Sequence, residues 1–345
     1  MRPFEYAAPT DSKQAVELLG ASWEDAAVFA GGTDLLGLMK DDVVAPKRLV
    51  NVKQIAELKA IGFTPRTGLR IGAGAHLADL ADNVNVRQHF LALAAAVDEA
   101  ASPQIRHMAT IGGNLCQRPR CWYFRNGFGL LAQRDGKSLV QEGDNRYHAI
   151  LGNDGPALFV SPSSIAPALV AYNARVRLLG PEGPREVELA KFFVTPTEEG
   201  QREHDLKPNE MIVEVVVPAP AAGSHAAHYE VRQKYAFDWP LATAAVVLQM
   251  TGNTVKEARV VLGQVAPIPW VSEEAAAAIQ GKTIDEQTAG AAGAAAVAKA
   301  RGLGRNDYKI QLARVAVKRA LLAAAKGGGM AANSVLISSR DGGEA

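Results

Sequence analysis

The pattern of hydrophobic and polar positions divides the chain into three parts. Residues 1–55 alternate between short apolar strands and amphipathic helices, in the order strand, helix, strand, helix, strand. Residues 56–178 begin with a strand and continue with helices, of which 90–100 is nearly all apolar on one side and therefore predicted to be buried. Residues 179–326 favour strands first and then two helices. This order of elements predicts an α+β fold, and residues 327–345 are expected to form a mobile tail.

The individual elements follow from the same pattern. Strands are predicted at 28–30, 48–52, 69–73, 176–179, 211–217, 229–234, 242–251 and 257–262, and helices at 34–40, 77–82, 90–100, 285–300 and 308–326. A further helix follows the cap formed by Pro9, Thr10 and Asp11.

A stretch at about 115–160 departs from this pattern, because it has little periodicity and is rich in Arg, Gly, Asp and aromatic residues. We interpret it as a long insert, and long ordered loops are usually functional. Its Arg118, Arg120, Trp122, Tyr123, Phe124 and Arg125 are typical of an interface. A locally packed loop explains the same residues, and both interpretations stay open.

Composition narrows the class of protein. The chain has 345 residues, 48% hydrophobic and 21% charged, with a net charge of +1, so no attraction to nucleic acid or anionic membrane is expected. No apolar run reaches the roughly 18 residues of a membrane-spanning helix, and no signal sequence is evident. The two cysteines exclude a disulfide scaffold. We expect a cytoplasmic protein, although export together with a partner would place it in the periplasm.

The first candidate for chemistry is a glycine loop between a strand and a helix. Residues 28–36 read Val-Phe-Ala-Gly-Gly-Thr-Asp-Leu-Leu. Adjacent glycines tolerate positive φ, so that successive N–H groups can converge on an anion, and Thr33 adds a hydroxyl. The loop therefore predicts a phosphate cradle, although an ordinary turn is the more common explanation when the loop is taken alone.

A second glycine loop strengthens that interpretation. Residues 102–114 read Ser-Pro-Gln-Ile-Arg-His-Met-Ala-Thr-Ile-Gly-Gly-Asn after the buried helix. Here too the backbone can approach a ligand closely, and we expect a diphosphate to lie against bare N–H groups of both loops. Two such loops predict one large phosphorylated ligand between two subdomains.

Taken in order, the motifs resemble the flavin subunit of molybdenum hydroxylases, the family of xanthine dehydrogenase, carbon monoxide dehydrogenase and aldehyde oxidoreductase. The motifs are Ala-Gly-Gly-Thr-Asp at 30–34, Arg-Ile-Gly-Ala at 70–73, the second glycine loop, Ser-Pro-Ser-Ser-Ile-Ala-Pro-Ala-Leu at 161–169, Glu-Met-Ile-Val at 210–213, the run 262–270 and Asn-Asp-Tyr-Lys at 306–309. The resemblance covers roughly residues 2–325. It implies a vanillyl-alcohol-oxidase (PCMH)-type FAD-binding fold in two subdomains, 1–55 and 56–178, with a C-terminal α+β domain over 179–326.

The resemblance also implies which residues bind FAD. The pyrophosphate would be held by Ala30, Gly31, Gly32, Thr33, Asp34 and Leu35, and the rest of the cofactor by Thr110, Gly113 and Asn114. Further cofactor contacts are implied for Ile105, Ser163, Ser164, Ile212 and Lys234. His76 either lines the cofactor pocket or is a turn histidine. The chain is expected to carry no catalytic residue and no metal ligand.

Three departures from the family pattern are visible. Relatives usually place a carboxylate near the cofactor where this chain has Ser164, and often a lysine where it has Glu230, with Arg232 and Lys234 close by. The insert resembles that of relatives carrying an extra [4Fe–4S] cluster. Such a cluster normally needs four thiolates, and Cys116 and Cys121 are too few. We therefore predict that the insert persists without the cluster.

The implied function is electron transfer. Substrate, an aldehyde in our interpretation, would be oxidised in a molybdopterin-binding large subunit. Electrons would pass through a [2Fe–2S] subunit to FAD on this chain and then to NAD, a quinone or dioxygen. Two other classes remain possible, a free-standing FAD oxidase or dehydrogenase and a non-catalytic interaction module.

Overall fold

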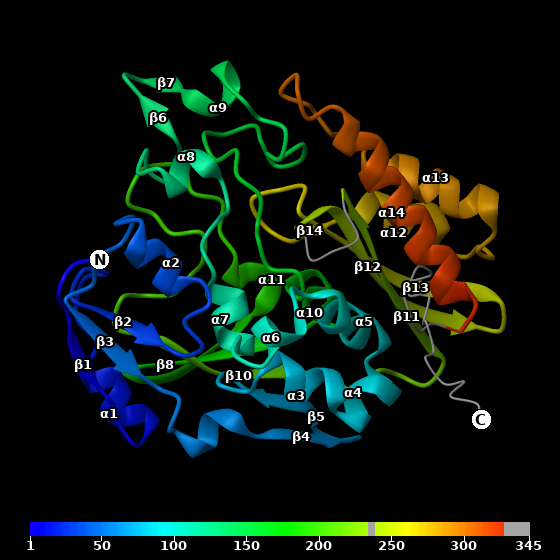
Figure 1. Cartoon of the computed structure of the whole chain (residues 1–345). Helices are drawn as coiled ribbons and strands as arrows, with labels where there is room; N and C mark the ends of the chain where they lie inside the picture. Colours follow the sequence, from blue (N-terminus) through cyan, green and yellow to red (C-terminus); the bar gives the residue numbers. More distant parts are fainter. Residues whose placement is uncertain (234–238, 328–345) are drawn as a thin grey trace, which may run out of the picture.

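The first subdomain is a small parallel sheet flanked by two short helices. The structure is a computed structural model that describes residues 1–233 and 239–327. Its first elements are β1 (Glu5–Ala7), α1 (Ser12–Glu17), β2 (Ala26–Phe29), α2 (Leu35–Lys40) and β3 (Arg48–Asn51). The strand order is β1-β3-β2, with both pairs parallel (Figure 1). The predicted order of strands and helices is confirmed, and Asp11 caps α1 by accepting from Gln14 N at 2.8 Å.

The second subdomain is built on a five-stranded sheet. Its strand order is β4 (Ile61–Thr64), β5 (Gly68–Gly72), β10 (Met211–Val217), β8 (Arg175–Gly180) and β9 (Gly183–Glu188), and every pair is antiparallel. The short η1 (Ala56–Lys59) leads into it. The predicted boundary at residue 179 falls inside β8. Because β10 pairs with both β5 and β8, the sheet is complete only at residue 217, and a new sheet starts with β11.

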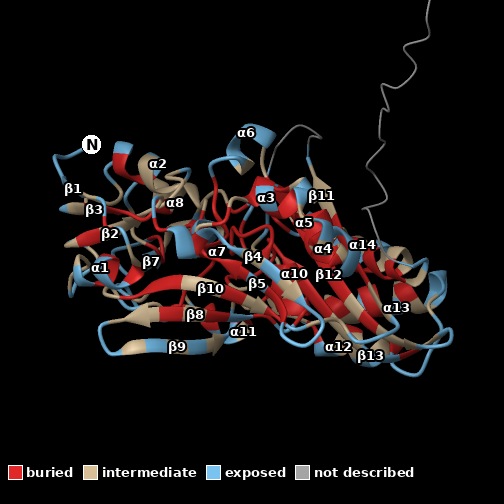
Figure 2. Ribbon diagram, turned by 90° about the horizontal axis from the view of Figure 1, so that it is seen from below, coloured by how far each residue is buried: buried red, intermediate tan, exposed pale blue. Residues whose placement is uncertain are grey.

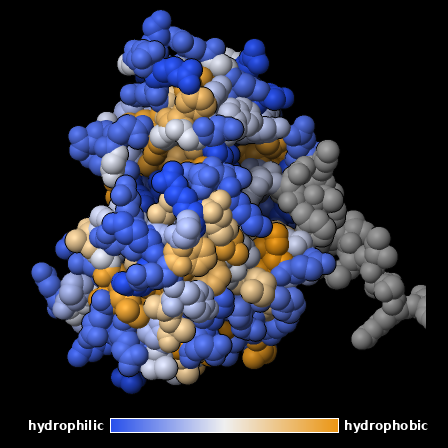
Figure 3. Space-filling model, turned by 60° about the vertical axis from the view of Figure 1, so that its left-hand side comes forward, coloured by the Kyte–Doolittle hydropathy of each residue, from blue (hydrophilic) through white to orange (hydrophobic). Residues whose placement is uncertain are grey.

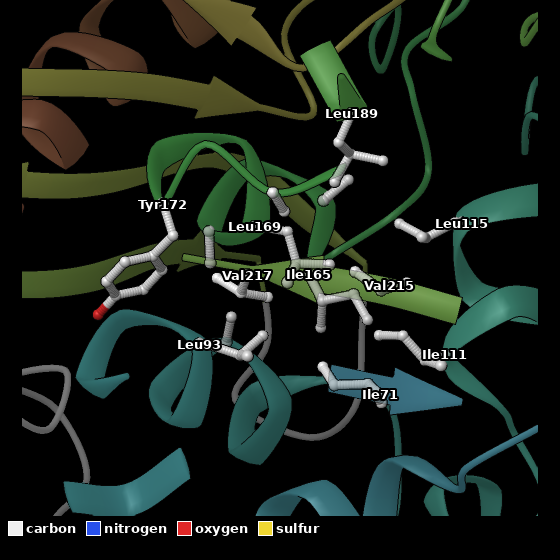
Figure 4. Close-up of a cluster of buried hydrophobic side chains, with 14 of the residues drawn as sticks. Ile71, Leu93, Ile111, Leu115, Ile165, Leu169, Tyr172, Leu189, Val215 and Val217 are labelled. Atoms are coloured by element: carbon white, nitrogen blue, oxygen red, sulfur yellow. The ribbon is translucent and has the colours of Figure 1, made fainter. Parts of the chain in front are cut away.

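The helices of this subdomain enclose the main hydrophobic core. They are α3 (Leu77–Asp82), α4 (Val84–His89), α5 (Leu91–Glu99), α6 (Pro103–Arg106), α7 (Ile111–Cys116), α10 (Ala166–Ala171) and α11 (Leu189–Phe192). Leu93 of α5, Ile111 of α7 and Leu169 of α10 are buried in one cluster with Ile71 and Val215 of the sheet (Figure 4). The predicted burial of the 90–100 segment is confirmed, since Ala92 to Val97 are all buried.

The insert rises above α2 at the top of the molecule in Figure 1 and has local structure of its own. It contains α8 (Trp122–Arg125), the hairpin of β6 (Gln133–Arg134) and β7 (Lys137–Ser138), and α9 (Leu139–Glu142). A buried cluster of Phe124, Leu130, Leu131, Ala157 and Phe159 holds it together and includes Leu38 of α2. The insert therefore packs on the helix that follows the first glycine loop.

The C-terminal domain is a four-stranded antiparallel sheet covered by three helices. The strands are β11 (Ser224–Arg232), β12 (Pro240–Thr251), β13 (Thr254–Gly263) and β14 (Trp270–Val271), in that order, and the helices are α12 (Glu273–Ile279), α13 (Glu286–Ala296) and α14 (Tyr308–Ala325). The pattern did not predict α12. The predicted tail lies, from residue 328 onward, outside the described residues.

Buried residues run without interruption from the second subdomain into the C-terminal domain (Figure 2). α10 packs on β12 and β13, and α5 packs on β11. At this seam a partly buried ionic network joins Arg232 of β11 to Glu99 of α5 at 3.0 Å and to Glu230 at 2.6 Å. His228, fully buried, contacts Glu230 at 3.0 Å.

The surface carries no broad apolar area on the face shown in Figure 3, where hydrophobic residues form separate patches among hydrophilic ones. Among residues 1–233 and 239–327, no helix combines the length and hydropathy required to cross a bilayer.

Candidate functional site

The first glycine loop presents a row of N–H groups without acceptors. In the described part of the chain, none of the main-chain N–H groups of residues 31–35 donates a hydrogen bond to another protein atom. Gly32 has φ of 70°, the left-handed conformation that a side chain would strain. A row of N–H groups without acceptors at the start of a helix suits an anionic ligand, as the sequence predicted.

These residues line a cavity between the two subdomains. Ala30, Gly31, Gly32, Thr33, Asp34 and Leu35 all border this first cavity, which has a volume of about 220 Å³. Thr110, Gly113 and Ile212 border it from the second subdomain. The structure thus brings these predicted cofactor residues to one place. An apolar wall of Leu19, Val28, Val44, Pro46 and Val52 completes the first subdomain's side.

Gly31 is the point at which the two glycine loops meet. A Cβ atom on this residue would lie 1.9 Å from the carbonyl oxygen of Met108 and 2.7 Å from its carbon. Only glycine permits this approach. The first loop therefore rests directly on the segment that leads into the second one.

The second glycine loop differs from the prediction. The N–H groups of Ile111 and Gly112 donate to the carbonyls of Ala75 and Ala73, and Gly113 N donates to Oγ1 of Thr110, the N-cap of α7, at 3.1 Å. These three N–H groups are therefore used within the protein, two by the carbonyls of the 73–75 segment and one by the helix cap. The prediction of bare N–H groups is therefore wrong for the second loop. Its Gly112 serves close packing, since a Cβ there would lie 3.0 Å from Ala73.

Within residues 1–233 and 239–327, five predicted cofactor residues do not border the first cavity: His76, Ile105, Asn114, Ser163 and Ser164. Asn114 Oδ1 accepts a hydrogen bond from Ser163 Oγ at 2.6 Å, which ties α7 to the buried 161–165 segment. Ser164 is buried nearby. Ile105 is 45% exposed on α6.

His76 pairs with Thr110 in a β-bridge at the start of α3 and also lies outside the cavity lining. Its backbone N–H donates to Asp79 at 3.3 Å. This matches the interpretation as a turn histidine. Lys234 lies outside the described residues.

Asp34 is held by arginines of the insert, a contact that the sequence did not predict. Arg120 and Arg125 each lie 2.8 Å from Asp34 Oδ1, and the backbone N–H of Arg118 donates to Oδ2 at 2.8 Å. We call residues 118–125 the arginine arm. Two guanidinium groups on one carboxylate leave the surroundings of the glycine loop electropositive, which suits an anion.

The other side of the first cavity is formed by residues around 202–212. Arg202 lies 4.2 Å over the ring of Trp23, and the ring of Trp23 meets His204 edge-on at 6.1 Å. Burial lowers the pKa of His204, which favours the neutral imidazole. No local pattern could predict these contacts, because they join segments about 180 residues apart.

A second cavity of about 240 Å³ lies between the insert and the C-terminal domain. Lys309 lines it and donates to the carbonyls of Tyr147, His148 and Gln264 at 3.2, 3.0 and 2.7 Å. Burial lowers the pKa of Lys309 to about 7. Since all its donors have acceptors, Lys309 joins the insert to the C-terminal sheet.

The two cysteines are separate free thiols. Burial raises the pKa of Cys116 to about 12, with Glu203 adding to the effect, and Cys121 Sγ lies 3.1 Å from His148 Nε2. Within residues 1–233 and 239–327, no three His, Cys, Asp or Glu side chains gather as a metal site would require. The insert is held by the apolar cluster around Phe124 and Leu130.

Glu230, aligned with a frequent lysine of relatives, points into the ionic network of the domain seam. Its carboxylate is only 3% exposed and is shared between His228 and Arg232. Neither cavity is lined by Glu230 or Arg232. In this chain the charges at 230 and 232 therefore serve the contact between domains.

Comparison with known proteins agrees with this site. The family model "FAD binding domain in molybdopterin dehydrogenase" matches residues 2–220, and "CO dehydrogenase flavoprotein C-terminal domain" matches residues 227–324. The chain is 35% identical to the aldehyde oxidoreductase FAD-binding subunit PaoB of Escherichia coli, over 83% of this chain and 87% of that protein. It is 34% identical to the carbon monoxide dehydrogenase medium chain of Hydrogenophaga pseudoflava, over 93% of this chain and 96% of that protein.

The fold agrees as well. Carbon monoxide dehydrogenase from Hydrogenophaga pseudoflava, in a form that lacks the Mo-pyranopterin moiety of its cofactor, superposes with a TM-score of 0.73 and 32% identity over 95% of this chain and 99% of that one. Reconstituted CO dehydrogenase from Oligotropha carboxidovorans superposes with a TM-score of 0.73 and 26% identity over 95% of this chain and 100% of that one. The predicted fold class and the predicted cofactor are confirmed. The chain belongs to the FAD-binding subunits of the molybdenum hydroxylase family of oxidoreductases.

Proposed function

We propose that this chain is the electron-transfer subunit of a molybdenum hydroxylase complex that oxidises an aldehyde. Substrate is oxidised in a molybdopterin-binding large subunit, and a [2Fe–2S] subunit delivers the electrons to FAD on this chain. The external acceptor is NAD, a quinone or dioxygen. The aldehyde assignment rests on the likeness to the aldehyde oxidoreductase FAD-binding subunit PaoB and on the arginine-rich insert.

The row of unsatisfied N–H groups at residues 31–35 carries the proposal. Main-chain donors without acceptors beside a cavity fit a diphosphate, and Arg120 and Arg125 offset the charge of Asp34. The apolar wall around Val28 and Pro46 suits the adenine. When bound, FAD accepts two electrons and passes them on. The residues of this chain bind and orient it.

The complex is proposed to act in the cytoplasm. The thiols of Cys116 and Cys121 are free, which suits a reducing compartment. Cell fractionation with antibody detection tests this, and recovery of the complex from the periplasm would contradict it.

The function is tested by separating cofactor binding from turnover. The purified full chain should show flavin absorption bands near roughly 370 and 450 nm. It should not oxidise an aldehyde alone, and the flavin should be reduced when the two partner subunits and an aldehyde are added. A colourless chain that takes up no FAD would refute the cofactor site. Aldehyde turnover by the isolated chain would instead favour a free-standing FAD enzyme.

A further inference from the structure

The insert contacts the first glycine loop through a charged anchor. Asp34 is 15% exposed and accepts from Arg120, Arg125 and the backbone of Arg118, all at 2.8 Å. Charge-assisted hydrogen bonds of this kind are stronger than neutral ones. The carboxylate of the loop is therefore fixed from three directions by one arm.

The arm itself is rigidly supported. Arg125 also donates to the carbonyls of Pro119 and Arg118, each at 2.8 Å. Arg118 forms a buried ion pair with Glu203 and lies 4.8 Å over the ring of Phe124. The arm is thus held by its own backbone and by the second subdomain, so its guanidinium groups reach Asp34 already ordered.

A second, apolar contact joins the insert to the same element. Leu38 of α2 is buried against Phe124, Leu130, Leu131 and Phe159 of the insert. The insert therefore contacts the glycine loop through ion pairs at Asp34 and contacts α2 one turn later through apolar packing at Leu38.

We propose that the arginine arm is a positioning clamp that orders the N–H groups of residues 31–35 for the diphosphate of FAD. Asp34 is the anchor of this clamp, and Arg120 and Arg125 are positioning residues. This inference rests on the proposed placement of the diphosphate in the first glycine loop. It gives the insert a task that requires no metal centre.

The direction in which Asp34→Asn changes the affinity for FAD distinguishes the clamp from a simple charge effect. If Asp34 were only a carboxylate near an anion, Asp34→Asn would remove a repulsion and tighten FAD binding. If Asp34 anchors the clamp, the same substitution frees the loop and weakens binding. We expect the dissociation constant of FAD to rise by roughly tenfold in Asp34→Asn and in Arg125→Met.

The experiment uses the full chain freed of flavin and titrated with FAD, with quenching of flavin fluorescence as the readout. Hydrogen exchange of the Leu36 and Leu38 amides, which donate to the carbonyls of Gly32 and Asp34 in the loop, gives a second readout in the flavin-free chain and should be faster in both variants. The double variant should bind no more weakly than the worse single one, because both changes break one contact. Arg134→Met is the matched control, since Arg134 lies in the insert over Phe128 and should leave binding unchanged.

The results of these titrations and exchange measurements either support the clamp or overturn it. Unchanged or tighter FAD binding by Asp34→Asn, or unchanged amide exchange, would overturn the clamp. If Arg125→Met fails to fold, Arg120→Met tests the same contact from the more exposed side of Asp34. Failure of the wild-type chain to bind FAD would refute the proposed function itself, whereas wild-type-like Asp34→Asn would refute only the clamp.

Discussion

Replacing Gly31 by alanine tests the geometry of the cradle most directly. The new Cβ would lie 1.9 Å from the carbonyl oxygen of Met108, which is more than ~1 Å closer than a carbon–oxygen contact of about 3.3 Å. The Cβ atom is fixed directly to the main chain and the Met108 oxygen is itself a main-chain atom, so no side-chain rotation can relieve the overlap. The loop must move away from Met108 by a distance similar to the overlap.

The expected loss follows from that displacement. Overpacking of this kind costs about 1–3 kcal/mol, and hydrogen bonds to a charged group weaken by about 1.5–3 kcal/mol when their geometry is lost. A loss of about 2 kcal/mol corresponds to a roughly thirtyfold rise in the dissociation constant of FAD. Fluorescence titration of the flavin-free chain measures this value, and thermal unfolding measures the accompanying drop in stability.

Gly37→Ala is the matched control. Gly37 lies on α2, and a Cβ there meets nothing within 4 Å. Alanine in a helix is favoured over glycine by about 1 kcal/mol, so this variant should be slightly more stable and bind FAD normally. If Gly31→Ala retained wild-type affinity and stability, the argument that the loop position determines binding would be wrong.

Three further predictions concern the insert and its supports. Leu38→Ala should lower the free energy of unfolding by about 2–5 kcal/mol, because it opens a cavity under the insert. The control Val84→Ala, at a position that is 58% exposed, should change this free energy little. Equal denaturation midpoints for the two variants would contradict the prediction. Lys309→Met should lower the melting temperature well below that of the surface variant Lys318→Met, because three buried carbonyls lose their donor at about 1–3 kcal/mol each. Burial and the nearby Lys309 lower the pKa of His148 from 6.5 to about 4. Between pH 6.5 and pH 4, His148 is therefore protonated in the unfolded chain and neutral in the folded one, so the free energy of unfolding falls as the pH drops through this range. The loss attributable to His148 is about 3 kcal/mol, and denaturant unfolding of His148→Leu should show a shallower pH dependence; an identical slope would refute this assignment.

The local pattern predicted the elements well where hydrophobic periodicity was strong. The long strands and α14 follow it, and the burial of α5 was evident from its apolar face. The boundary near residue 179 was misplaced because strand pairing across some 140 residues, such as β5 with β10, has no local signal. α12 was missed because it has only 7 residues, too few for a helical period to stand out.

The site also combines features that are encoded locally in the sequence with contacts between distant segments. The first glycine loop was predictable because its conformation is encoded in consecutive residues, from Ala30 to Leu35. The arginine arm was noticed only as interface-like, since its partner Asp34 lies more than 80 residues away. The second loop was misinterpreted because the N–H of Gly112 donates to the carbonyl of Ala73, nearly 40 residues away, and the N–H of Gly113 donates to the helix cap Thr110.

The ionic network at Glu99, His228, Glu230 and Arg232 has a consequence for how cofactor enters and leaves. Separating α5 from β11 would break these ion pairs and expose the apolar core that the two domains share, since Ala226 and Ala245 are buried in the same cluster as Leu93 of α5. We therefore expect the second subdomain and the C-terminal domain to move together. FAD is then expected to enter and leave on the side of the first subdomain, where the first cavity lies, and the contact between Asp34 and the arginine arm is expected to open with it.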